Sequence, residues 1–141
     1  MIQLPRIAVG TVQAGVNPQL STWALKNVLE RSGLHVQSFY SQSRFLACDG
    51  ALRITGQSAR HLDSWLMQPG ICRELFIHGA RSADFAVVEG QFDVVGGATT
   101  VGGSLDKLCQ WLDLPQIAVD DVRDLQLCRD LRLPQGDYGF L

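Results

Sequence analysis

Residues 6–33, RIAVGTVQAGVNPQLSTWALKNVLERSG, decide the fold class of this chain. Arg6–Gly10 is a short apolar run that ends in glycine, which is typical of a buried strand in a parallel sheet. Asn17 can cap a helix, and Pro18 suits the first helical turn because no backbone N–H is needed there. Gly33 can close that helix in the left-handed conformation. The stretch therefore predicts a strand, a glycine-bearing loop and a helix.

The helix carries apolar residues at helical spacing, and we expect them to form its buried face. They are Leu20, Trp23, Ala24, Leu25, Val28 and Leu29. Two further groups are expected to pack inward: Leu62, Trp65 and Leu66 within Arg60–Met67, and Ile71, Leu75 and Phe76 on a later helix.

The loop between strand and helix has the frame of a phosphate-binding loop but lacks its charge. Gly10 and Gly15 have the G-x-x-x-x-G separation of a P-loop. The next two residues should then be lysine and serine or threonine, and here they are Val16 and Asn17. The chain has two lysines, Lys26 and Lys107, and neither lies in or before this loop.

The rest of the chain alternates strands and helices. Strands are predicted at Leu34–Phe39, Asp84–Glu89 and Pro115–Val119, and helices at Pro69–Gly79, after Ser104 and at Val122–Leu131. Tyr40–Gln57 is predicted to be a long loop with one helical turn at Ala51–Ile54. This order indicates one domain over residues 1–141, a three-layer α/β/α fold with a mostly parallel sheet and an extended tail at about residues 133–141.

Composition excludes several classes of function. The chain has 141 residues, 46% of them hydrophobic and 18% charged, with a net charge of −2 and no Lys/Arg cluster, which argues against nucleic-acid binding. Its apolar runs are too short to span a membrane and no signal-peptide pattern follows Met1, so we expect no membrane association and a cytoplasmic location. The irregularly spaced Cys48, Cys72, Cys109 and Cys128 favour buried small side chains over a metal site.

In parallel sheets with helices on both faces, ligands bind beyond the carboxyl ends of the strands. Five polar residues are predicted to fall at that edge: Thr11, Asn17, Tyr40, Glu89 and Asp120.

The order of motifs resembles the nucleotide-binding domain of cobyrinic acid a,c-diamide synthase and its dethiobiotin-synthetase-like relatives, which are P-loop proteins. That family shows G-T-S-S-G-V-G-K-T-T, G-L-x-V-x-x-F-K, L-D-x-W-L-M and V-V-E-G. This chain carries Gly10-Thr11, Gly15-Val16, Gly33-Leu34, Leu62-Asp63-Ser64-Trp65-Leu66-Met67, Val87-Val88-Glu89-Gly90 and Val119-Asp120. The likeness covers about Arg6 to Asp121.

The resemblance implies an ATP-dependent amidoligase. In such an enzyme Mg-ATP phosphorylates a corrinoid side-chain carboxylate, and ammonia from glutamine displaces the phosphate. It places Glu89 near metal and phosphates, so Glu89 is the candidate catalytic residue, and Glu89 and Asp120 are the candidate metal ligands. Asp63 falls on a family position, although we prefer a role as a helix cap below Trp65. The candidate cofactor-binding residues are Gly10, Thr11, Gly15, Val16, Asn17, Ser21 and Arg44.

This chain departs from the family pattern where the pattern matters most. When the family motif is aligned on Gly15-Val16 instead, its G-K-T-T becomes Asn17-Pro18-Gln19-Leu20. In this alignment Pro18 replaces the loop lysine, and Gln19 replaces the hydroxyl that would hold magnesium. ATP and Mg binding are therefore expected to be weak or lost, unless Ser21, Thr22 or Arg44 compensates.

Three hypotheses follow. The first is a degenerate, non-catalytic domain that acts by binding, as a homodimer or with a protein partner. The second is a divergent ATP-dependent amidoligase domain that needs a separate glutaminase part. The third is a binder of a corrinoid-like or anionic small molecule between Gly15 and Glu89. The missing lysine opposes the enzyme, whereas the retained Glu89 favours it.

Overall fold

The structure is a computed structural model that describes residues 3–13, 16–43, 50–93, 103–121 and 138–140. Its sheet has six strands in the order β3-β2-β4-β1-β5-β6, and every neighbouring pair is parallel. The strands are β1 (Arg6–Thr11), β2 (Val36–Tyr40), β3 (Arg60–His61), β4 (Phe85–Gln91), β5 (Gln116–Ala118) and β6 (Tyr138–Phe140). The helices are α1 (Gln19–Arg31), α2 (Gly50–Thr55), α3 (Pro69–Gly79) and α4 (Leu105–Leu112).

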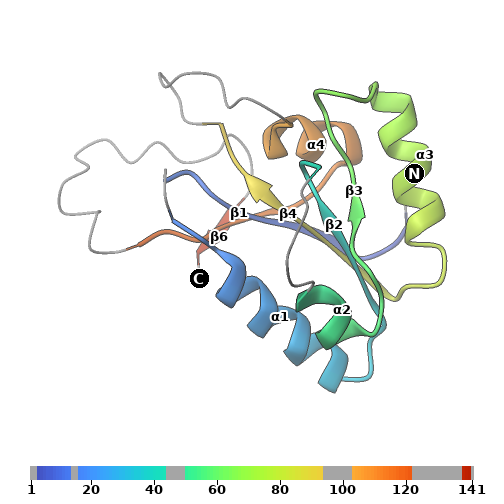
Figure 1. Cartoon of the computed structure of the whole chain (residues 1–141), viewed down its shortest axis with the longest axis vertical. Helices are drawn as coiled ribbons and strands as arrows, with labels where there is room; N and C mark the ends of the chain where they lie inside the picture. Colours follow the sequence, from blue (N-terminus) through green and yellow to red (C-terminus); the bar gives the residue numbers. More distant parts are fainter. Residues whose placement is uncertain (1–2, 14–15, 44–49, 94–102, 122–137, 141) are drawn as a thin grey trace.

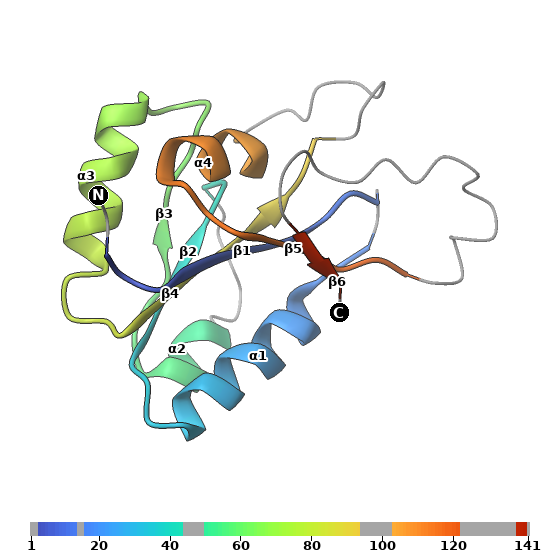
Figure 2. The ribbon, with the colours of Figure 1, turned by 180° about the vertical axis from the view of Figure 1, so that it is seen from behind.

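The helices cover the two faces of the sheet, with α1 and α2 on one face and α3 and α4 on the other (Figures 1 and 2). Successive residues of β1 point to opposite faces of the sheet. Ala8 packs in the apolar cluster below α3 and α4, and Val9 packs in the cluster near α1. On β4, Val88 and Val87 divide in the same way. The three-layer α/β/α prediction is confirmed.

The ends of α1 follow local rules. At its end, Gly33 adopts φ +84°, the left-handed conformation expected of a glycine there. At its beginning the cap residue is Pro18, not Asn17 as predicted, because the Pro18 carbonyl accepts the first helical bond, from Thr22 N–H at 3.0 Å. The side chain of Asn17 still satisfies a backbone donor of the first turn, since its Oδ1 accepts the Gln19 N–H at 3.0 Å.

The predicted buried face of α1 is wrong in part. Leu20 is 76% exposed and Val28 is 62% exposed, whereas the buried residues of this helix are Thr22 and Lys26. Leu25 and Leu29 do pack against the apolar cluster on the α1 side. The helix is therefore rotated so that a lysine, not the centre of the apolar stripe, faces the sheet.

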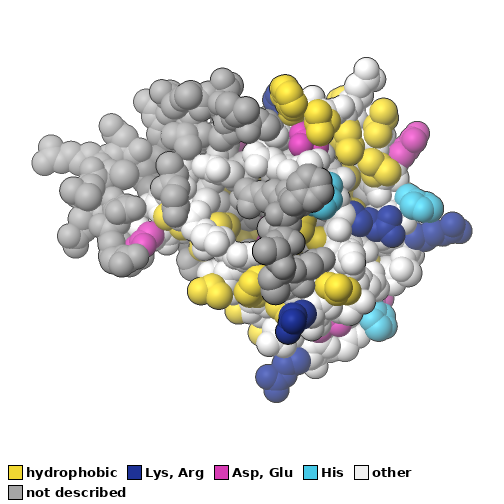
Figure 3. Space-filling view, in the orientation of Figure 1, with side chains coloured by type: hydrophobic (Ala, Val, Ile, Leu, Met, Phe, Trp, Pro, Cys, Tyr) yellow, Lys and Arg dark blue, Asp and Glu magenta, His cyan; other side chains and the backbone are white. Residues whose placement is uncertain are grey.

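Two other expected core groups are also only partly right. Leu62 and Phe76 are fully buried, but Trp65 is 72% exposed and Leu66 is 62% exposed. Ile71 and Leu75 are exposed too, and Figure 3 shows apolar side chains at the surface in the region of α3. The other buried side chain of α3 in this apolar cluster is that of Cys72, which is smaller than the leucine and isoleucine expected to be buried.

The remaining predictions have mixed outcomes. The helical turn predicted at Ala51–Ile54 lies within α2. The tail is extended at Tyr138–Phe140, as predicted, but there it forms β6 and pairs with β5. The helix predicted at Val122–Leu131 lies outside the described residues, as do Cys48 and Cys128, whereas Cys72 and Cys109 are buried as expected. Among the helices that the structure describes, none has the length and apolar character needed to cross a bilayer.

Candidate functional site

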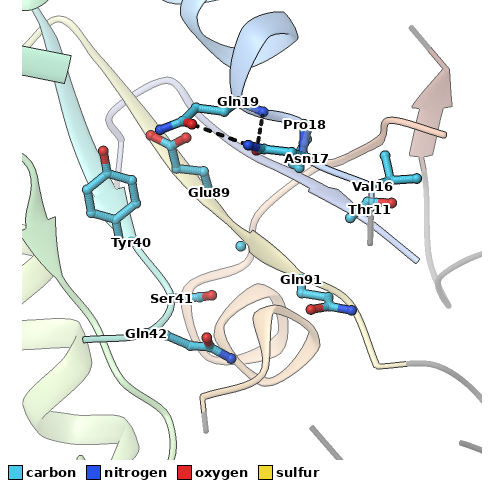
Figure 4. Close-up of a pocket in the computed structure, with 11 residues that line it drawn as sticks. Thr11, Val16, Asn17, Pro18, Gln19, Tyr40, Ser41, Gln42, Glu89 and Gln91 are labelled. Atoms are coloured by element: carbon cyan, nitrogen blue, oxygen red, sulfur yellow. Dashed lines mark hydrogen bonds between the residues drawn. The ribbon is translucent and has the colours of Figure 1, made fainter. Parts of the chain in front are cut away.

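A pocket of about 410 Å³ opens at the carboxyl ends of β1, β2 and β4 (Figure 4). Three segments line it besides Thr11: the start of α1, the end of β2 and the end of β4. The described lining residues are Thr11, Val16, Asn17, Pro18, Gln19, Tyr40, Ser41, Gln42, Glu89, Gly90 and Gln91. Four of the five polar residues predicted at this edge, Thr11, Asn17, Tyr40 and Glu89, therefore lie together.

Two glycines allow the backbone to pack tightly at the base of this region. A Cβ atom on Gly10 would lie 2.7 Å from the Gly90 carbonyl oxygen and 2.7 Å from Leu105 Cδ2. The two glycines are register partners in the β1–β4 pair. Gly10, predicted to bind a cofactor, does not line the pocket among the described residues, and its role here is close packing of strand against strand and helix.

Glu89 forms a buried ion pair that was not predicted from the sequence. Its side chain is 8% exposed, and its Oε1 atom contacts the ammonium nitrogen of Lys26, whose side chain is 0% exposed. The same Lys26 nitrogen lies 5.9 Å from the centre of the Tyr40 ring. A sign of this contact was present in the sequence, because Lys26 interrupts the apolar stretch of α1.

Asp120 follows β5 and is absent from the described lining of the pocket that Glu89 lines. Its role as a metal ligand together with Glu89 stays a prediction. Burial raises the pKa of the Asp120 carboxyl, and interactions with the Val12 backbone and the Thr11 hydroxyl offset part of that increase. No group of three or more His, Cys, Asp or Glu side chains suited to a metal ion occurs in the described ranges.

The polar residues beside Asp120 tie the ends of β1 and β5 together. Gln13 Oε1 accepts the Asp121 N–H at 2.6 Å, and Gln13 Nε2 donates to the Asp121 carbonyl at 3.3 Å. The Thr11 hydroxyl accepts the Gln13 N–H at 3.0 Å. Through these bonds Gln13 links the segment after β1 to the segment after β5.

Asp63 was expected to cap a helix below Trp65, but the residues that follow it form a turn and not a helix. It is 4% exposed. Its Oδ1 accepts the N–H groups of Trp65 at 2.9 Å and Leu66 at 3.3 Å, and its Oδ2 accepts the Ser43 N–H at 3.2 Å. The carboxylate therefore holds the turn after β3 against the segment after β2.

Only some of the other candidate cofactor-binding residues line the pocket. Val16 and Asn17 line the pocket, whereas Ser21 lies on α1 and is not part of the described lining. Gly15 and Arg44 lie outside the described residues.

The residues that are described do not fit a magnesium–nucleotide complex. Pro18, which the resemblance aligns with the family lysine, offers neither a charge nor a backbone donor. Gln19 presents an amide where a hydroxyl would hold the metal, and that amide accepts from the Asn17 side chain at 3.4 Å. The one carboxylate in the described lining, Glu89, is engaged by Lys26.

Comparison with known proteins finds relatives that carry closely related names. No family model matches the chain. It is 28% identical over 126 residues to a cobyrinate a,c-diamide synthase of Leptospira interrogans, covering 88% of this chain and 28% of that protein. It is 29% identical to a protein of the same name from Syntrophotalea carbinolica, covering 82% and 26% of the two chains.

A hydrogenobyrinate a,c-diamide synthase of Streptomyces coelicolor is 29% identical over 84% of this chain and 25% of its own length. The chain thus spans about a quarter of the length of the curated relatives that it matches.

Proposed function

The chain is homologous to the cobyrinate a,c-diamide synthases over most of its length, and on that premise we propose that it is a non-catalytic binding domain of this family. In this proposal the pocket at the ends of β1, β2 and β4 binds a small polar ligand, and no nucleotide is hydrolysed there. The degenerate loop is part of the same proposal.

The observation that supports the proposal most directly is the ion pair between Glu89 and Lys26. Phosphoryl transfer depends on cations that neutralise the charge of the phosphates. In the described lining of the pocket Glu89 is the only charged side chain. Its negative charge is already paired with the ammonium group of Lys26, which is not part of that lining. The groups that remain toward the pocket are amides and hydroxyls, including Thr11, Asn17, Ser41 and Gln91 (Figure 4). Such groups bind a ligand through hydrogen bonds, not through charge.

One observation favours a second candidate, the divergent ATP-dependent amidoligase. Glu89 keeps its place at the carboxyl end of β4 and lines the pocket, as an acidic group of a working site would. In that case the complete reaction would need further protein, because this chain matches only about a quarter of the length of each relative. Assembly into a homodimer or with a protein partner also stays a proposal, which analytical ultracentrifugation would test.

Calorimetry with Mg-ATP and a steady-state ATPase assay test the first proposal against the second. We expect no saturable heat and no turnover above that of a Glu89→Gln variant. The matched control is Glu74→Gln, which removes an exposed carboxylate on α3, far from the pocket lining. Turnover by the wild type that Glu89→Gln abolishes and Glu74→Gln preserves would overturn the non-catalytic proposal.

A further inference from the structure

The Lys26 side chain is an unusual feature for a surface helix of a parallel α/β fold. It is completely buried, although lysine is among the residues least often found inside proteins. Burying an ammonium group is costly unless a partner of opposite charge compensates it. Here the partner is Glu89, on a strand 63 positions further along the chain.

Lys26 and a pocket ligand would approach the Glu89 carboxylate from different sides. Glu89 stands at the pocket end of β4, whereas Lys26 is on α1 and is not part of the described lining. The lysine therefore reaches the carboxylate from the protein interior, and the ligand would approach from the pocket. Lys26 also lies beside the face of the Tyr40 ring, which disfavours an anion and tolerates a cation.

A carboxylate at the end of a strand is the kind of ligand that Mg²⁺ and Mn²⁺ prefer. The ammonium group of Lys26 already contacts Glu89 Oε1 and neutralises its charge. A divalent cation binding there would have to displace a buried lysine or lie close to its positive charge. Both alternatives are unfavourable.

We propose that the ammonium group of Lys26 takes the place of a divalent cation at Glu89, so that the pocket excludes free metal ions and metal–nucleotide complexes and binds its ligand without metal. Lys26 is then the residue that determines the metal selectivity of the site. This inference rests on the proposed function in one respect only, namely that the pocket at Glu89 is the binding site.

The test uses Mn²⁺ as the probe, and its binding to the full chain is followed by electron paramagnetic resonance. Wild type and Lys107→Met, which removes the other, exposed lysine, should show no saturable binding. Lys26→Met should bind Mn²⁺ saturably, at least about tenfold more tightly than the weakest affinity that the measurement detects. Adding Glu89→Gln to Lys26→Met should remove the new binding. Saturable binding by wild type, or no gain in a folded Lys26→Met variant, would overturn the proposal.

A second measurement needs no substitution at Lys26. Wild-type protein with ¹⁵N-labelled backbone amides is titrated with Mn²⁺ and followed by NMR. If Glu89 excludes Mn²⁺, the Glu89 amide signal stays as sharp as that of Lys107. Selective broadening of the Glu89 signal would mean that Mn²⁺ binds at Glu89, which contradicts the inference even if Lys26→Met does not fold.

The outcomes separate this inference from the proposed function. ATP hydrolysis by the wild type refutes the non-catalytic proposal, whereas Mn²⁺ binding without hydrolysis refutes only the role assigned to Lys26. Absence of both in the wild type, with Mn²⁺ binding gained in Lys26→Met, supports both.

Discussion

The Ser41 hydroxyl oxygen lies 1.9 Å from the position that a Cβ atom on Gly90 would occupy. Ser41 follows β2 and Gly90 belongs to β4, and both residues line the pocket. The Ser41 Cβ atom is also only 2.7 Å from that position, so a change of the serine rotamer alone would not make room. The two neighbouring strands can approach at the base of the pocket because residue 90 has no side chain.

Gly90→Ala should therefore destabilise the protein by about 1–3 kcal/mol, the usual cost of overpacking a close-packed region. Urea denaturation would measure the change. The second variant, Ser41→Gly combined with Gly90→Ala, removes the obstructing atoms and should recover much of the loss. Equal stability of Gly90→Ala and wild type would show that the strands can separate at no cost.

Lys26→Met should lower the free energy of unfolding by about 3–5 kcal/mol, because it leaves the buried Glu89 carboxylate without this ammonium group. The double variant Lys26→Met/Glu89→Gln should be close to wild type in stability, since it removes both charges and keeps similar volumes. Urea denaturation of wild type, the two single variants and the double variant gives the coupling free energy between Lys26 and Glu89. Independent, additive effects of the two substitutions would contradict a direct ion pair.

Stability should fall at alkaline pH because of Cys109. Burial, with a smaller effect of the nearby Asp106 charge, raises the pKa of this thiol to about 12 from the ordinary value of 9.0. Above pH 9 the unfolded chain loses this proton while the folded chain keeps it, so stability decreases as pH rises. The decrease from this group amounts to at most about 1.4 kcal/mol per pH unit between 9 and 12.

Urea unfolding of wild type and Cys109→Ala at a series of pH values between 8 and 10.5 measures that contribution. The alanine variant is expected to be less stable at every pH, but its stability should decline less steeply above pH 9. Parallel declines in the two proteins would mean that Cys109 ionises as easily in the fold as in the unfolded chain.

Trp65 and Leu62 should respond to substitution in opposite ways, although both were expected to be buried. Trp65→Ser should change stability by no more than about 0.5 kcal/mol, because the side chain is 72% exposed. Leu62→Ala should cost about 2–5 kcal/mol, because Leu62 is fully buried in the cluster on the α3 and α4 side. Thermal and urea denaturation of the two variants would compare them directly. A costly Trp65→Ser would indicate that a partner or second copy covers this face.

Local signals in the sequence were enough for helices α1, α3 and α4 and for strands β1, β2, β4 and β5, whereas β3 and β6 were not predicted as strands. The helix predicted at Pro69–Gly79 has the same limits as α3, and the proline in its first turn explains where it begins. The apolar runs in Arg6–Gly10 and Asp84–Glu89 correspond to β1 and β4, which are buried and central. Backbone conformation depends mainly on nearby residues, so these features could be read without a structure.

The rotation of α1 and the environment of Glu89 were decided only in three dimensions. The helical period shows that α1 is amphipathic, but Leu25 and Leu29 face the sheet while Leu20 and Val28 do not. In that orientation Lys26 of α1 contacts Glu89 of β4, which lies 63 positions further along the chain. The sequence alone predicted a parallel α/β domain and a group of polar residues at the ends of its strands. Only the tertiary structure brought Lys26 to the one acidic group of the described pocket, because charge pairing in the interior depends on distance in space and not on spacing along the chain.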